Sequence, residues 1–402
     1  MIRGPACWLL AAVVCLASWP ATASGQNAAW EKYIEEAAEA YEKGDYAKAE
    51  KVCLLAIKEA EKFGSNKDGL VARFAGLALL GRVYETQGRF PQAESVLEQS
   101  LAMAEKGFGP DHPNVARVRR FLGAVKTALG KYAEAEVLLL RSADTLELYF
   151  GPDHEQVGET IFELGDLYKA QGKYVKAEQS YQRSLSIAEK AFGRDDSRVT
   201  IYLNRLAELY RLQRKYAAAM PLANRAVTIN EKALGPNDPS LAADLDVLGS
   251  LYSNQDQHAQ AEPLFRRALT ILEKTVGPED KRLAGTLSNL GVLYRKQGKY
   301  AEAEPLYQRA LAIREKTLGP DHWKVAITLD NLVVLYTAQG KYTEADPLSR
   351  RAVAILEKTL GPDHPELAAA LENRADLLRK LNHWLEAAKL ELRAKRIRLK
   401  QQ

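Results

Sequence analysis

A 42-residue period constrains the fold of this 402-residue chain more than any other feature. One glycine recurs at this spacing without a gap, and the stretch around it returns each time with substitutions. A fixed period of about 20 to 50 residues is typical of stacked supersecondary units. The recurring glycines are Gly109, Gly151, Gly193, Gly235, Gly277, Gly319 and Gly361.

Each period contains two amphipathic helical patterns. In residues 277–320, the first pattern places Leu283, Leu287, Leu290 and Tyr294 at spacings of three and four, which is one stripe of a helix. Gly298 follows it and can adopt the left-handed conformation that ends a helix. We therefore expect a first helix that ends shortly before Gly298.

The second pattern runs over residues 303–318. We expect Pro305 to mark its start, because proline is tolerated in the first turn of a helix. Equivalent prolines occur in three other repeats, namely Pro221, Pro263 and Pro347. The loop that follows reads Gly-Pro-Asp-His, so Gly319 is expected to end one helix and His322 to help cap the next.

Four positions of the repeat carry the packing. Three hold small residues, for example Ala303, Ala310 and Gly291, and small residues allow two helices to approach to about 8–10 Å. The fourth holds tyrosine, as at Tyr294. Lys126 and Leu378 replace this tyrosine, and Val333 replaces the small residue of the Gly291 position. Because valine is larger, the sequence does not decide whether the two helices of that repeat approach as closely as in the others.

These residues resemble the tetratricopeptide repeat, in which Leu-Gly-x-x-Tyr lies on one helix and alanine with other small residues on the next. The run GKYAEAEPLYQRALAIREKTLGPDH resembles specifically the kinesin-light-chain type. The likeness covers about residues 67–380. It implies a right-handed α-solenoid, and the repeat count predicts about nine antiparallel helix pairs: eighteen helices and no strands.

The chain is expected to have four parts. Residues 1–23 read as a signal peptide, 24–66 as a divergent helix pair, 67–380 as the repeat array and 381–402 as a basic capping helix. The leader has a positive start, an apolar run over residues 6–18 and a cleavage site at 21–23. That run is shorter than the roughly 20 residues of a membrane span. An uncleaved anchor is the alternative, and no other segment is apolar enough to span a membrane.

The leader indicates export to a bacterial periplasm or to the medium. Cys53 is then the one cysteine of the mature chain, and its apolar neighbours predict a buried, unreactive thiol. The formal charge is +4, or +3 once Arg3 leaves with the leader. This near balance gives no indication of a nucleic-acid partner.

No catalytic, metal or cofactor site is expected. The chain lacks the serine-hydrolase, zinc-protease and phosphate-loop motifs. Four histidines recur at the loop position, but at least one repeat separates each from the next, which is too far for ligands of one ion. Their expected role is to cap the following helix. They are His112, His154, His322 and His364.

In the resembled family, the first helices line a concave groove that binds peptides. The resemblance maps Asn289, Asn331 and Asn373 onto this groove in three successive repeats. An asparagine amide can both donate to and accept from a peptide backbone, although the same amides can instead bond a neighbouring repeat. Cations expected along the same groove are Arg205, Arg211, Arg295, Arg379 and Lys380. The charged clamp of chaperone-binding members is absent, because Gly285, Ile327 and Ala369 stand where cations are needed.

The last helix is strongly basic, with Lys389, Arg393, Arg396 and Lys400 as a secondary patch. A solvated capping helix explains this composition, and an acidic partner or anionic surface is the alternative. The resulting hypothesis is an exported, non-enzymatic scaffold for a protein or peptide partner. Two alternatives remain: a structural subunit of an envelope or secretion complex that docks through its convex face or basic C-terminal helix, and, behind it, an enzyme.

Overall fold

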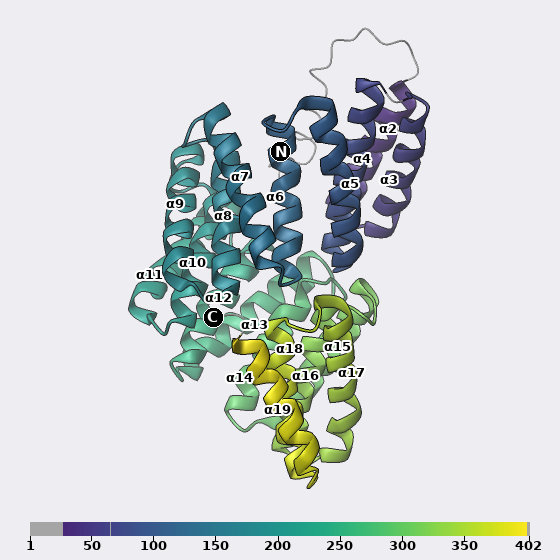
Figure 1. Cartoon of the computed structure of the whole chain (residues 1–402). Helices are drawn as coiled ribbons and strands as arrows, with labels where there is room; N and C mark the ends of the chain where they lie inside the picture. The colour runs from purple at the N-terminus through teal and green to yellow at the C-terminus, as the bar shows by residue number, and fades with distance from the viewer. Residues whose placement is uncertain (1–26, 65, 400–402) are drawn as a thin grey trace. The chain divides into compact units, whose positions relative to one another are not determined.

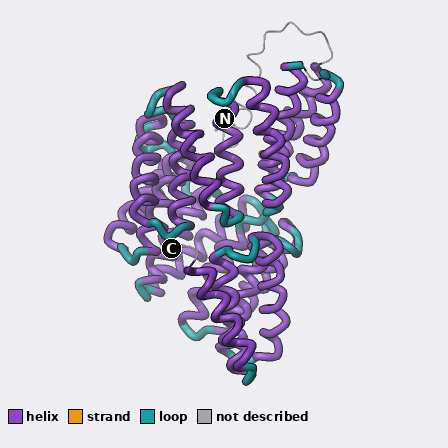
Figure 2. The backbone as a smooth tube through the Cα atoms, viewed as in Figure 1, coloured by secondary structure: helices purple, strands orange, loops and turns teal. Residues whose placement is uncertain are grey.

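The computed structural model describes residues 27–64 and 66–399, and within them the chain forms eighteen α-helices, one short 3-10 helix and no strand (Figures 1 and 2). The all-helical class and the number of helices are confirmed. The predicted leader, its cleavage site and Lys400 lie outside the described residues.

The chain divides into two compact units, one up to Glu163 and one from Leu164 onward, so the boundary falls inside α8. Unit 1 contains α2 (Asn27–Glu42), α3 (Tyr46–Glu61), α4 (Lys67–Thr86), α5 (Phe90–Phe108), α6 (Pro113–Ala128), α7 (Tyr132–Phe150) and the start of α8 (Glu155–Ala170). Unit 2 continues with α9 (Tyr174–Phe192), η2 (Ser197–Val199), α10 (Thr200–Leu212), α11 (Tyr216–Leu234), α12 (Ser240–Asn254), α13 (His258–Thr275), α14 (Leu283–Lys296), α15 (Tyr300–Leu318), α16 (Trp323–Ala338), α17 (Tyr342–Leu360), α18 (Pro365–Lys380) and α19 (Trp384–Leu399).

Within unit 2, each helix packs on the next, and the first helices of successive repeats also touch one another: α10 with α12, α12 with α14, α14 with α16 and α16 with α18. The described second helices of this unit make no comparable contact with one another. The first helices are therefore more closely spaced than the second helices. They form the inner side of the stack in this unit.

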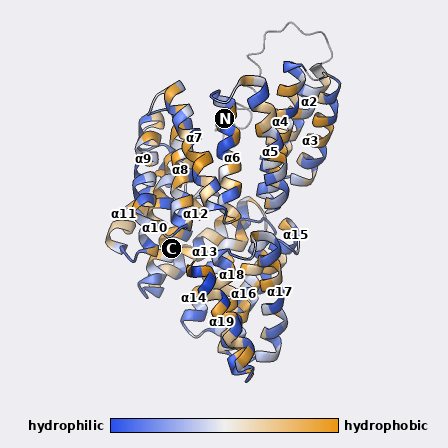
Figure 3. Ribbon diagram, viewed as in Figure 1, coloured by the Kyte–Doolittle hydropathy of each residue, from blue (hydrophilic) through white to orange (hydrophobic). Residues whose placement is uncertain are grey.

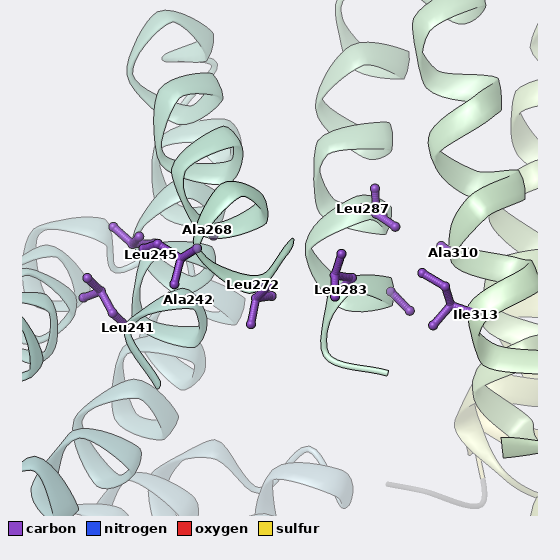
Figure 4. Close-up of a cluster of buried hydrophobic side chains, with 11 residues drawn as sticks. Leu241, Ala242, Leu245, Ala268, Leu272, Leu283, Leu287, Ala310 and Ile313 are labelled. Carbon is purple, nitrogen blue, oxygen red and sulfur yellow. The ribbon is translucent and has the colours of Figure 1, made fainter. Parts of the chain in front are cut away.

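A continuous apolar layer joins neighbouring pairs. Leu283 and Leu287 of α14 pack in one cluster with Leu272 of α13 and Ile313 of α15 (Figure 4). Each of these side chains is at most 5% exposed. Burying a leucine or isoleucine stabilises a fold by roughly 1.5–3 kcal/mol. Apolar and polar residues are both visible on the labelled helices (Figure 3).

Glycine and a large side chain face each other at the helix crossings. A Cβ built on Gly291 would lie 2.7 Å from Cε1 of Tyr307, which is fully buried. In the next repeat, Val333 takes the place of Gly291 and Ser349 takes the place of Tyr307, and both are buried. The close approach at Val333 is kept because the larger residue faces a smaller one. Four other crossings pair glycine with a large residue: Gly81 with Leu97, Gly123 with Leu139, Gly165 with Tyr181 and Gly249 with Phe265.

The repeated tyrosine makes a polar bond to the preceding repeat. The Tyr294 hydroxyl lies 2.8 Å from Oε1 of Glu262. At the same position Lys126 is almost completely buried, and its ammonium donates to Glu94 at 2.7 Å. Lysine therefore preserves the bond to the preceding second helix. Leu378 gives up this bond and packs instead in an apolar cluster.

Of the predictions for the helix ends, the capping role of the histidines is confirmed and the start at Pro305 is wrong. Gly319 has a φ of 91°, and Nδ1 of His322 accepts from the backbone N–H of Lys324 at 3.0 Å. His112, His154 and His364 accept in the same way, so the capping role is confirmed. The prediction for Pro305 is wrong. Helix α15 begins at Tyr300, because the left-handed turn at Gly298 already reverses the chain, and Pro305 lies inside the helix.

Candidate functional site

The candidate site is the inner face of unit 2, which we define as the side of α10, α12, α14, α16 and α18 that carries Arg205, Asn289, Asn331 and Asn373. Nδ2 of Asn373 donates to Oδ2 of Asp330, on the preceding first helix, at 2.6 Å. This is the alternative in which an asparagine joins neighbouring repeats. Asn331 is half-buried and has no side-chain hydrogen bond to the described residues. Ligand contact by these amides stays a prediction.

Two carboxyl groups on this face have altered acidity. Burial raises the pKa of Asp246 to about 7, although hydrogen bonds from Thr286 and Asn289 act to lower it. Burial likewise raises the pKa of Asp330 to about 6, against the hydrogen bond from Asn373. Near neutral pH, these two carboxyl groups are therefore partly protonated and carry less than their full negative charge.

The predicted cations fall into two groups. Arg205 lies 3.7 Å from Asp166 and 3.2 Å from Glu208, and Arg379 lies 2.5 Å from Glu391, so both have carboxylate partners. Among the described residues, the other three predicted cations have no such partner. They are Arg211, Arg295 and Lys380.

Two further cations were not predicted. Arg314 of α15 occupies the position that leucine holds in the repeats before and after it, at Leu272 and Leu356. Its guanidinium donates to the backbone carbonyl of Lys324 at 3.1 Å and to the Thr328 hydroxyl. No described carboxylate pairs with it, and burial lowers its pKa to about 10. A residue-by-residue alignment of the repeats would have singled out this arginine.

Lys324, at the start of α16, lies seven residues before Asn331 and so on the same side of the helix. Burial lowers its pKa, and the charges of Arg314, Lys281 and Arg205 lower it further. These cations come from α10, α15, α16 and the loop before α14, and they lie close enough for their charges to act on Lys324.

The predicted basic patch of α19 is divided between two roles. Arg393 pairs with Glu357 of α17. This pair belongs to a series in which an arginine of each second helix from α11 to α19 bonds a glutamate 36 residues earlier, the other members being Arg225–Glu189, Arg267–Glu231, Arg309–Glu273 and Arg351–Glu315. Arg393 thus joins repeats, whereas Lys389 and Arg396 are exposed and have no described ion-pair partner.

In the part of the chain that the structure describes, no cluster of histidine, cysteine, aspartate and glutamate is arranged to hold a metal ion. None of the described helices is both long and apolar enough to cross a membrane. Cys53 is completely buried.

A family model described as tetratricopeptide repeat matches residues 72–147, 119–190, 197–274, 282–358 and 324–400. No curated protein matches the chain. A crystal structure described as a Podosopora anserina putative kinesin light chain with nearly identical TPR-like repeats is 29% identical, with a TM-score of 0.42, over 51% of this chain and 97% of that one.

Two other solved structures cover more of the chain. A Rap protein complexed with competence and sporulation factor has a TM-score of 0.59 at 15% identity, over 93% of this chain and 99% of that one. Aspartyl phosphate phosphatase F from Bacillus subtilis has a TM-score of 0.52 at 13% identity, over 94% and 96%. At these identities the likeness is one of fold.

Proposed function

Because the chain belongs to the tetratricopeptide repeat family, with repeats of the kinesin-light-chain type, we propose that it is an exported, non-enzymatic scaffold. Its partner is a protein or peptide segment that carries carboxylates and lies along the inner face of unit 2. The motor role of kinesin light chains is not part of this proposal.

The observation that carries the proposal is a group of cations on this face that have no carboxylate partner among the described residues. Arg211, Arg295 and Lys324 have no described carboxylate partner, and Arg314 on the adjacent α15 adds a half-buried positive charge. Opposite charges attract most strongly where water is partly excluded. A carboxylate of the partner would provide the counter-charge that these cations lack.

The face also has room and hydrogen-bonding groups for a peptide. A Cβ added to Gly285 would meet nothing within 4 Å, so the surface beside Asn289 is open. Asn331, one repeat further on, has a free amide to donate to and accept from a peptide backbone. Charge and backbone recognition would thus act together.

Binding of short peptides tests this proposal. We expect the full chain to bind an acidic peptide library more tightly than a lysine-substituted library of the same length, with an affinity that falls as salt rises. The variant Arg211→Ser/Arg295→Ser/Lys324→Ser should lose at least tenfold in affinity. The matched control Arg214→Ser/Lys232→Ser/Lys274→Ser removes exposed cations elsewhere in unit 2 and should bind normally. Equal binding by the two variants would remove the inner face as the site.

Export rests on the composition of residues 1–23 and has a separate test. We expect the protein isolated from its native host to have the mass of a chain that starts near Ser24. A mass that includes Met1 would rule out cleavage, and recovery in the cytoplasmic fraction would rule out export.

A role as an assembly subunit that docks through its last helix is the second candidate. One observation favours it, namely the exposed leucines of α19.

A further inference from the structure

The outer side of α19 carries a row of leucines. Leu385, Leu392 and Leu399 are 82%, 61% and 59% exposed. They recur every seven residues, so they lie along one line of the helix. Trp384, 61% exposed, lies at the start of the same helix. We call this line the leucine row.

The leucine row is not needed to hold α19 in place. The helix packs against the array through Ala387, Ala394 and Ile397, which are at most 2% exposed, and Leu390 is partly buried against α18. These residues lie on the side opposite the leucine row. The exposed leucines therefore contribute nothing to the core.

The same line is mostly polar in the two preceding second helices. The positions of the leucine row hold Thr343, Arg350 and Glu357 in α17, and Ala301, Gln308 and Glu315 in α15. A capping helix would be expected to keep such polar residues, because its outer face meets water. The last helix instead exposes apolar residues that the repeat itself does not call for, which is typical of an interaction surface.

The charges beside the leucine row are almost all positive. Lys389, Lys395 and Arg396 are exposed and form no ion pair with described residues. Of the two nearby carboxylates, Glu391 is already paired with Arg379, which leaves Glu386 exposed. A partner with the opposite charge pattern would be favoured, since charges that flank an apolar seam select the partner of a helix.

We propose that the outer side of α19 docks an amphipathic helix of another protein, with an apolar seam flanked by acidic side chains. A second copy of this chain fits less well, because it would oppose Lys389, Lys395 and Arg396 with the same cations. A membrane surface also fits less well, since cations flank a row only one leucine wide, whereas a helix lying in a bilayer needs a broad apolar face. This surface is distinct from the inner face.

The test uses a labelled 21-residue peptide of three heptads with leucine at a and d and glutamate at e and g. We expect fluorescence anisotropy to show that this peptide binds the full wild-type chain, and that Leu392→Ser weakens its affinity at least tenfold. For the wild type, the affinity should also fall in high salt. The control Leu148→Ser removes a leucine that is 88% exposed on α7 and should leave the affinity unchanged. Both leucines are exposed, so neither change disturbs the core.

Two further arms separate this proposal from its alternatives. The inner-face variant Arg211→Ser/Arg295→Ser/Lys324→Ser should bind the heptad peptide normally, and loss of binding there would place the peptide on the inner face and overturn the proposal. A peptide with lysine at e and g should bind at least tenfold more weakly. Equal binding of both peptides, sedimentation as a dimer that Leu392→Ser dissolves, or binding only to phosphatidylglycerol vesicles would also overturn it.

Discussion

Exchanging the two residues at one helix crossing tests whether size complementarity sets the spacing of the repeats. Gly291→Val places a side chain where a Cβ alone would lie 2.7 Å from Tyr307, so overpacking should destabilise the fold by about 1–3 kcal/mol. Tyr307→Ser empties a completely buried position and should destabilise it by about 3–5 kcal/mol. The double variant copies the Val333 and Ser349 pair of the next repeat.

In the double variant, valine fills part of the space that the tyrosine ring leaves. We expect its destabilisation to be smaller than the sum of the single changes by at least about 1.5 kcal/mol, within the range measured for residues in contact. Urea unfolding followed by circular dichroism gives the midpoint and slope for each protein. Gly285→Val is the control on the same helix, because its Cβ meets nothing within 4 Å; it should be neutral or slightly stabilising. Additive single effects, or an equal loss at Gly285, would refute the reasoning.

Three shorter predictions follow from buried polar and reactive groups. Lys126→Met should destabilise the fold in urea unfolding, because Glu94 loses one of its two lysine partners, and Lys126→Tyr should recover most of the loss by restoring the residue typical of the repeat. Burial raises the pKa of Asp244 to about 6, although the hydrogen bonds from Asn204 and Asn230 act to lower it. Because the native state then holds the proton more tightly than the unfolded chain, the free energy of unfolding should fall as pH rises from about 4 to 6. Asp244→Asn should flatten this pH dependence of the unfolding midpoint. Burial raises the pKa of Cys53 to about 12, so iodoacetamide at pH 8 should leave the native thiol unmodified and label it in urea, as mass spectrometry would show.

The repeat period predicted the helices and the loops because the residues involved act locally. The left-handed turn at Gly319 and the cap at His322 depend on a few adjacent residues, and the spacing of Leu283 and Leu287 identifies the buried side of α14 directly. The start of α15 was missed because the conformation of Gly298 determines it, whereas Pro305 is only tolerated there.

The candidate site was harder to predict because it depends on contacts between repeats. The partner of Asn373 is Asp330, 43 residues earlier, and the partner of Arg393 is Glu357, 36 residues earlier. Nothing in the residue type says whether an asparagine or arginine will bind a neighbour or remain free for a ligand. Arg314 was visible only as a departure from the leucines at equivalent positions.

The arginine–glutamate series has a consequence for the length of the array. Arg309 bonds Glu273 and also donates to the carbonyl of Pro278, and Arg351 bonds Glu315 and the carbonyl of Pro320 in the same way. If residues 278–319 were deleted, Arg351 would take the place of Arg309 and Pro320 that of Pro278, so the same bonds would form across the junction. A gene for such a chain can gain or lose whole repeats by duplication or deletion without having to create a new interface.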